Sequence, residues 1–425
     1  MPLVFLAAAA LGLVGCGIAW VLVRGDATPD PTADSVVAAV HLGVLATLSM
    51  GVLGAMHQFV PVVSGRPLRS VSLARATFVT WLLAAWLLPL GIAAQQEAVV
   101  EVGGGFAALA ITLAVVNLSS PLSVRGKGAP VTGLRFSLAG FVVTACFGVL
   151  YVADRRGNWF DLSGHVVLAH ASIGLFAWLG LTYVSVAEKL WPMFFLAHVP
   201  GRRLAGRVAV WAIPCGVALL APGLLLGVVP LATAGAALLA LGLGAHLTSL
   251  SAHVRHRRRR ADLHLGFVLT SAVWLVAGAG LALAAALVLP GDERTGLALV
   301  AAAVAAFGGW LLEALCGHAH KVVPFILWSS LRSRGVATGP AGKPLMFGDM
   351  YNHYLAAVAY ATVTCGIALL CAGLGASMPA LTATGGGLLA LTGLVVGANL
   401  SVVPVNMLRN HQRAASTPSN VLAQA

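Results

Sequence analysis

Charge is scarce in this sequence. Only 9% of its 425 residues are Asp, Glu, Lys or Arg, whereas 59% are hydrophobic, and the mean hydropathy is +0.93. A soluble chain of this length could not bury so much apolar side chain, because the surface of a folded protein does not shrink fast enough relative to its volume. The shortage of charge therefore excludes an ordinary soluble domain.

Several familiar motifs are also missing. The six cysteines stand singly in apolar segments and form no CxxC pair, so neither a disulfide framework nor a zinc finger is indicated. No phosphate-binding loop, GxSxG elbow or HExxH motif occurs, so an ATPase or a serine hydrolase is not expected. A CxxCH haem-attachment motif is absent too, so any electron donor is another protein or a quinol.

What the chain does contain is long apolar runs. Twelve of them are long enough to cross a bilayer as helices. The first has no basic residues before it and no cleavage site after it, so we treat it as a helix rather than a signal peptide. The prediction is an all-α integral membrane protein with one transmembrane domain, residues 1–410, and a polar tail at 411–425. The runs cover approximately 3–23, 35–60, 72–94, 102–120, 132–153, 165–192, 205–226, 229–250, 265–289, 295–320, 352–374 and 383–405.

Basic residues collect in alternate loops. The loops after even-numbered runs carry 19 of the 25 Lys and Arg, whereas the loops after odd-numbered runs carry four and most of the acids. Because positive residues stay on the cytoplasmic side, we expect both termini in the cytoplasm of a bacterial inner membrane. The net charge of +12 then reflects topology and attraction to anionic lipid. The expected partner is the lipid bilayer, not nucleic acid.

One short phrase recurs three times at the end of an apolar run. Its prolines are 131 and 132 residues apart. A second short signature, with the sequence Asn-Leu-Ser or His-Leu-Thr, follows each copy of the phrase. This pattern predicts three pseudo-repeated four-helix arcs, about 1–125, 126–262 and 263–410. The alternative is that each proline only terminates a helix. The phrases are His57–Pro61, Glu188–Pro192 and His320–Pro324, and the signatures are Asn117–Ser119, His246–Thr248 and Asn399–Ser401.

Polar side chains inside the apolar runs are the main functional signal, because each is costly at membrane depth. Neutral imidazole is a common ligand of metals and of haem iron. We therefore predict that His41 and His170, near the outer face, bind a cofactor. His318 and His320 are about 200° apart around a helix, so they should face different neighbours. The candidate metal ligands are His165, His57, Glu188, His318 and His320.

Less specific roles are also open for these groups. Lys189 and Lys321 could extend to the interface, and Glu188 could simply pair with Lys189. Histidines near helix ends can sit at the headgroup level, bonded to water. We expect this of His198, His253, His256, His264 and His411.

Twelve helices in three arcs of four, with a histidine at the outer end of the second helix and another in the sixth, resemble haem-copper oxidase subunit I. The resemblance implies that His41 matches the ligand of the low-spin haem and that His170 is the nearest match to a copper ligand. The cofactors it implies are haem and copper. Segments 41–67, 169–194 and 316–328, which include HLGVLATLSMG, AHASIGLFAWLG and CGHAHKVVPFILW, also resemble a group of bacterial subunit-I-like proteins.

The chain departs from the oxidase pattern at the catalytic centre. Gly174 stands four residues after His170, where the main type of oxygen reductase carries a cross-linked tyrosine. The run at 205–226 has no His-His pair for copper, and Leu297–Ala306 has no histidine. Oxygen reduction coupled to proton pumping is therefore not expected, and whether the protein is an enzyme stays open.

Two functions remain. In the first, the protein binds haem or copper and handles a gas such as nitric oxide, or a metal, and a partner subunit or separate donor delivers any electrons. In the second, it is a transporter or assembly factor for a metal ion or haem. An outer histidine station would then capture the cargo, and an inner station of His57, Glu188, His318 and His320 would receive it.

Overall fold

The computed structural model describes residues 2–23, 33–157, 165–199, 203–287, 294–336, 338 and 343–416. Within them, twelve helical spans are long and apolar enough to cross a membrane, so the chain is a multi-pass membrane protein. This confirms the predicted number of runs. Nine spans are single α-helices: α1 (Pro2–Leu22), α4 (Val71–Ala93), α5 (Glu97–Leu122), α6 (Ala129–Gly157), α9 (Arg203–Leu225), α10 (Val229–Arg255), α11 (Leu263–Leu287), α14 (His353–Gly375) and α15 (Pro379–Ser416).

The second, sixth and tenth spans change helix type along their length. In each, an α-helix leads into an eight-residue π-helix and then into another α-helix. π-Helical segments of this length are rare, and no sequence pattern had predicted them. The segments are α2 (Asp34–His41), η1 (Leu42–Ser49) and α3 (Met50–Ser64); α7 (Val166–Ser172), η2 (Ile173–Gly180) and α8 (Leu181–Phe194); α12 (Arg294–Val304), η3 (Ala305–Leu312) and α13 (Glu313–Ser333).

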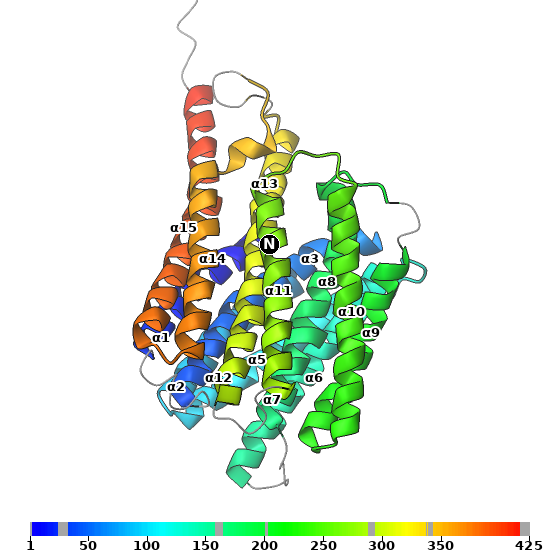
Figure 1. The fold of residues 1–425 in the computed structure, drawn as a ribbon. Helices are drawn as coiled ribbons and strands as arrows, with labels where there is room; N and C mark the ends of the chain where they lie inside the picture. Colours follow the sequence, from blue (N-terminus) through cyan, green and yellow to red (C-terminus); the bar gives the residue numbers. More distant parts are fainter. Residues whose placement is uncertain are drawn as a thin grey trace, which may run out of the picture.

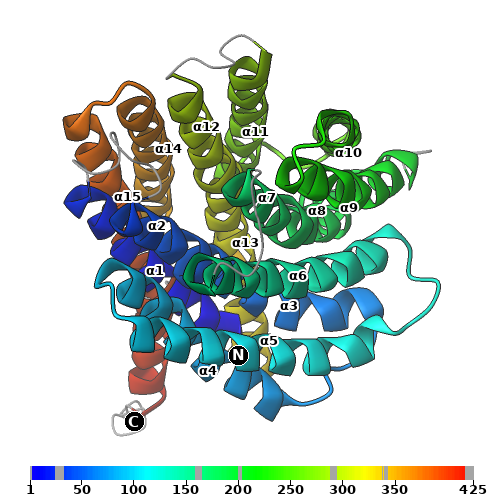
Figure 2. The same ribbon diagram turned by 90° about the horizontal axis from the view of Figure 1, so that it is seen from below.

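These three composite spans form the centre of the molecule. Between 61% and 67% of their apolar windows is buried inside the protein, against 22–44% for the other spans. Seen along the bundle, α3, α8 and α13 accordingly lie near the middle, with the single helices around them (Figure 2). The central position explains why polar side chains on these spans are shielded from lipid as well as from water.

Neighbouring helices on the outside pack as close pairs. The pairs are α4 with α5, α9 with α10 and α14 with α15, and α1 runs along α15 (Figure 2). Glycine permits the contact between α1 and α15, since a Cβ on Gly17 would lie 2.3 Å from the backbone nitrogen of Ala390. Small residues allow membrane helices to approach in this way.

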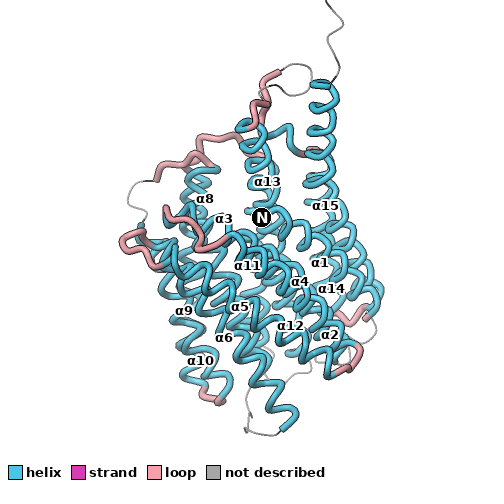
Figure 3. Tube along the Cα trace, turned by 180° about the vertical axis from the view of Figure 1, so that it is seen from behind, coloured by secondary structure: helices cyan, strands magenta, loops and turns pink. Residues whose placement is uncertain are grey.

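Successive spans run in opposite directions, so the loops gather at two ends (Figure 1). We call one the basic end; it holds the loops after α3, α5, α8, α10 and α13, and the loops after α10 and α13 are at the top of Figure 1. We call the other the acidic end; it holds the loops after α4, α9 and α14. Regular structure in the described residues is helical throughout (Figure 3), apart from an isolated bridge between Thr338 and Pro344. A short 3₁₀-helix, η5 (Phe347–Met350), precedes α14.

The proline phrases do not act in the same way at all three sites. Pro61 and Pro192 lie in the last turn of α3 and α8, so each of these helices ends within three residues of its proline. Pro324 lies inside α13, which continues to Ser333, so the helix-terminator interpretation is wrong there. α15 likewise continues to Ser416 and so extends into the segment predicted to be a polar tail.

Two buried asparagines, from the first and third Asn-Leu-Ser signatures, form hydrogen bonds to loop residues at the basic end. The Oδ1 atom of Asn117 accepts the backbone N–H of Ser70 at 2.9 Å, and that of Asn399 accepts the N–H of Asn352 at 2.7 Å. Ser70 and Asn352 are the N-cap residues of α4 and α14. Each asparagine therefore fixes the start of a helix, α4 or α14, whose N-cap residue lies 47 positions earlier in the chain. This is a structural role.

Candidate metal-binding histidines

His41 and His170 lie at the acidic end, each in the short α-helix before a π-helix. The Nδ1 atom of His41 bonds to the carbonyl of Val37 at 2.7 Å, which leaves its Nε2 atom available. The Nδ1 atom of His170 is buried and has no hydrogen-bond partner. Both rings are half-buried, and they lie on the second and sixth spans near the same end of the bundle. The binding of a cofactor by these two residues stays a prediction.

The surroundings of His170 are apolar. Its ring lies 5.8 Å from the ring of Phe147 on α6, and a Cβ built on Gly148 would come within 3.4 Å of its Cε1 atom. His165, in contrast, is exposed at the start of α7, where its backbone N–H donates to the carbonyl of Leu224. His165 remains a prediction as a metal ligand, with an exposed side chain.

Nearer the basic end, His57 and His320 have almost the same surroundings. The His57 ring stacks on Phe5 of α1 at 5.6 Å, and the His320 ring stacks on Phe267 of α11 at 5.8 Å. Each Nδ1 atom bonds to the carbonyl four residues earlier, at 2.8 Å. Both Nε2 atoms are buried without a partner.

Glu188 occupies the corresponding place in the second phrase. Its Oε1 atom accepts a hydrogen bond from Ser249 of α10, and a Cβ on Gly206 of α9 would meet its carboxylate. Lys189, the next residue, is exposed. Glu188 is therefore held between α9 and α10, away from the partners of His57 and His320.

The predicted inner station is not a single metal site. Among the residues that the structure describes, no three His, Cys, Asp or Glu side chains are grouped so that they could hold a metal ion. The reason is helix rotation: His57, Glu188 and His320 each face a different outer helix. His318 and His320 also face different neighbours, as their angular separation predicted.

His318 meets a residue that the sequence reasoning had set aside. Its ring centre lies 4.9 Å from that of His264 on α11, with the planes inclined by 78°. The expectation that His253 and His264 lie at the headgroup level is wrong, because both are 96% buried, with 4% of their surface exposed. His198 and His256 are exposed as expected, and the side chain of His411 lies outside the described residues. The burial of His253 and His264 could not be predicted from their positions near helix ends, because His198 and His256 are also near helix ends and are exposed.

Two further polar groups lie in the interior. Glu313, the first residue of α13, is fully buried; Thr364 donates to its Oε1 atom, and its Oε2 atom has no partner. Lys321 forms an ion pair with Asp262, which also lies 3.8 Å from Arg259. In the adjoining loop, burial and the nearby Asp262 carboxylate raise the pKa of Tyr351 above its ordinary value.

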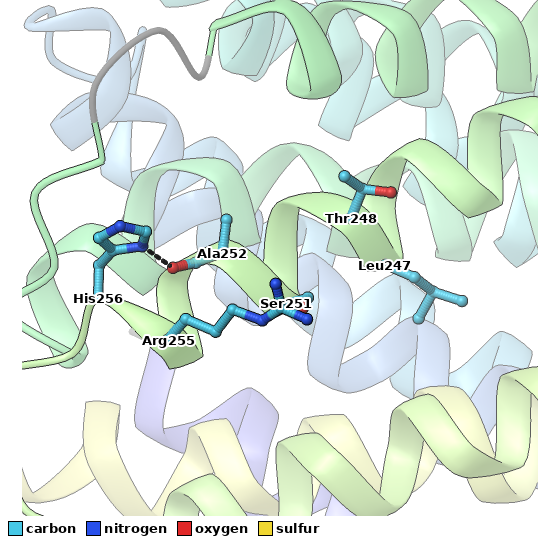
Figure 4. A pocket seen from close by; sticks show the side chains of 6 residues that line it. All are labelled: Leu247, Thr248, Ser251, Ala252, Arg255 and His256. Carbon is cyan, nitrogen blue, oxygen red and sulfur yellow. Dashed lines mark hydrogen bonds between the residues drawn. The ribbon is translucent and has the colours of Figure 1, made fainter.

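The cavities bear on whether a haem would fit. A cavity of about 480 Å³ lies against one face of α10, where Leu247, Ser251, Arg255 and His256 line it (Figure 4). A second, of about 340 Å³, is lined by Lys343, Pro344, Met346 and Asp349. Neither is lined by His41 or His170. These two cavities therefore give no support to a haem beside that pair.

The resemblance to haem-copper oxidase subunit I therefore rests on the helix pattern and on the residues quoted for it. A comparison of the chain with protein-family models and with curated proteins finds no match.

Proposed function

We propose that this membrane protein binds a transition-metal ion of the copper class between His41 and His170. The observation that carries the proposal is that each half-buried imidazole has a ring nitrogen free for a ligand: the Nδ1 atom of His170 is buried without a partner, and the Nδ1 hydrogen bond of His41 leaves its Nε2 atom available. Imidazole suits copper, iron, zinc and nickel. A hydrogen bond from the second ring nitrogen is the usual way to orient such a ligand.

We further propose the subunit-I-like arrangement of three four-helix arcs, with the basic end cytoplasmic. Three facts support it: the π-helices begin 131 and 132 residues apart, His57 and His320 stack alike on phenylalanine, and Asn117 and Asn399 cap alike. The positive-inside rule supports the orientation. In this arrangement the His41 and His170 site opens toward the outside of the cell.

A bare ion is favoured over haem as the occupant. A macrocycle needs a slot beside its ligands, whereas the ring of His170 packs against Phe147 and Gly148. Oxygen reduction is not proposed, because Gly174 leaves the site without the oxidase tyrosine. The proposed role is the handling of a metal, or of a gas that binds to it, without a complete oxidase centre.

The test is the metal and haem content of the protein purified in detergent. Elemental analysis and an absorption spectrum before and after dithionite should show copper and no Soret band. His41→Ala and His170→Ala should each lose that copper, and His198→Ala, an exposed histidine, should keep it. Full copper in the double variant, or no bound metal in correctly folded wild-type protein, would refute the proposal. A Soret band lost in the same variants would replace copper by haem.

Transport of a metal is the second candidate. It is favoured by imidazole nitrogens without a partner at the basic end, on His57, His318 and His320, as well as at the acidic end. Weak sites at several depths are what translocation needs. Uptake of copper into vesicles that contain the purified protein tests it. Glu188→Gln should slow uptake with little loss of thermal stability; lower stability with unchanged uptake would assign Glu188 a structural role.

A further inference from the structure

The hollow of about 480 Å³ against α10 lies on the outer face of the bundle (Figure 4). Every described residue that lines it belongs to this one helix or its C-cap. Thr248, Ser251 and Arg255 are exposed, whereas His246 and His253, on the opposite face of the helix, are buried. In a chain that spans a membrane, an exposed face of this kind is covered by lipid or by another protein.

The character of this face changes along the helix. Arg255 is in the last turn of α10, Ser251 lies one turn deeper, and Thr248 lies about two turns deeper. Below them, nothing lies within 4 Å of the Cβ position of Gly244, and Leu241 is 57% exposed. Charge and hydroxyl groups at the end of the span, with open apolar surface beneath, are arranged in the same order as the headgroup and acyl chains of a phospholipid.

Arg255 has no protein group to neutralise it. Within the part of the chain that the structure describes, no acidic side chain pairs with Arg255, and the nearest carboxylate along the chain, Asp262, is engaged by Lys321 and Arg259. The side chain of Arg255 runs back along α10 toward Ser251 (Figure 4). An anion that met the guanidinium in the hollow would therefore also meet the Ser251 hydroxyl.

The end of α10 does not oppose an anion as a bare helix C-terminus would. The last carbonyls of a helix carry partial negative charge. Here the carbonyl of Ala252 accepts a hydrogen bond from the Nδ1 atom of His256, and that of Val254 accepts one from the guanidinium of Arg257, each at 2.9 Å. The positive charges of Arg255 and Arg257 thus stand beside carbonyls that are already bonded, and such a place attracts an anionic headgroup.

We propose that this face of α10 binds one anionic phospholipid, with its phosphate on Arg255 and Ser251 and its acyl chains along Gly244 and Leu241. Arginine recognises phosphate through two parallel N–H bonds. A second copy of the chain suits this face less well: both copies cross the membrane in the same direction, so the contact would bring two Arg255 side chains together. The site requires a lipid bilayer and is independent of any metal at His41 or His170.

The experiment is native mass spectrometry of the full-length protein, stripped of lipid in detergent and titrated with phosphatidylglycerol or with phosphatidylcholine. The wild type should bind the first phosphatidylglycerol more tightly than phosphatidylcholine. Arg255→Ala should weaken phosphatidylglycerol binding about fivefold, and Arg255→Lys should weaken it less. Ser251→Leu fills the hollow without changing the charge and should also weaken it. Arg334→Ala is the matched control, because Arg334 is an exposed cation at the basic end outside the hollow.

Equal affinity of the wild type for the two lipids, or equal losses in Arg255→Ala and Arg334→Ala, would overturn the inference. Displacement of phosphatidylglycerol by inorganic phosphate would assign the hollow to a free anion instead. A lipid-free dimer that Ser251→Leu converts to a monomer would assign it to a second copy. If the variants do not fold, the wild type is cross-linked to phosphatidylglycerol with a photoreactive acyl chain. Cross-links on α10 near Gly244 are expected, and cross-links confined to other helices contradict the site.

Discussion

The indole nitrogen of Trp178 donates a hydrogen bond to the hydroxyl of Ser49, at 3.1 Å. Trp178 belongs to η2 and Ser49 is the last residue of η1, so this bond joins two of the three π-helices at the buried centre. Trp178 also stacks on Phe141 of α6, with ring centres 4.1 Å apart. The bond therefore holds the second and sixth spans in one rotational setting.

Ser49→Ala should destabilise the protein by about 1–3 kcal/mol, because it leaves the indole N–H buried without an acceptor. A thermal-unfolding midpoint in detergent measures the effect. Ser119→Ala is the control, since that hydroxyl is exposed and bonds within its own helix. With Trp178→Phe already present, Ser49→Ala should cost clearly less. Additive effects of the two substitutions would argue against the bond.

Gly12 should not tolerate alanine. A Cβ there would lie 2.2 Å from the carbonyl oxygen of Ala46, inside η1. Overpacking of this kind costs about 1–3 kcal/mol. Gly105→Ala is the matched control, because nothing lies within 4 Å of its Cβ position, and alanine is favoured over glycine in a helix by up to about 1 kcal/mol. Thermal midpoints should fall for Gly12→Ala and hold or rise for Gly105→Ala; the same change in both would contradict the close approach.

The two capping asparagines should differ in importance. Asn399 accepts the N–H of Asn352 and donates to its carbonyl at 3.0 Å, whereas Asn117 accepts from Ser70 and has a buried Nδ2 atom without a partner. Asn399→Ala should therefore lower the unfolding midpoint more than Asn117→Ala, each bond lost costing about 1–3 kcal/mol. Ser401→Ala, at an exposed site two residues on, is the control. The reverse order would mean that these bonds do not set the stability of the loops.

Tyr351 should make stability depend on alkaline pH. Its pKa is raised in the folded protein, so the unfolded chain loses the phenolic proton first. The stability contribution of the neutral phenol is complete below about pH 10 and is lost as the pH rises further. Tyr351→Phe should thus unfold less readily than the wild type above about pH 10. Tyr354→Phe is the control, because Tyr354 is 85% exposed. Parallel pH curves for the wild type and Tyr351→Phe would refute this role.

The candidate site shows where sequence reasoning stops. The separation of His318 and His320 was predictable, because two residues on one helix differ by about 200° whatever the helix packs against. The contact between His264 and His318 was not predictable, because it depends on how α11 and α13 are rotated about their axes. Proximity to a helix end suggested that His264 was exposed, whereas Phe194 and Phe195 cover it.

The π-helices show a second limit. Their residues are ordinary for apolar helices, so their composition does not indicate a π-helix. The three π-helices have the same spacing along the chain as the three proline phrases. A π-helix rearranges the hydrogen bonds of the backbone, and packing decides whether that is compensated. Here the indole N–H of Trp81 donates to the carbonyl of Leu45 in η1, at 3.1 Å.

The amino-acid sequence by itself determined the number of spans and their approximate limits. In a bilayer each span must satisfy its own backbone hydrogen bonds, so twelve apolar runs become twelve helices wherever they pack. The tertiary structure alone decided what the buried histidines meet: His264 contacts His318, and His57 and His320 stack on phenylalanines. Those pairings depend on helix rotation, which is set by side-chain packing between segments far apart in the chain.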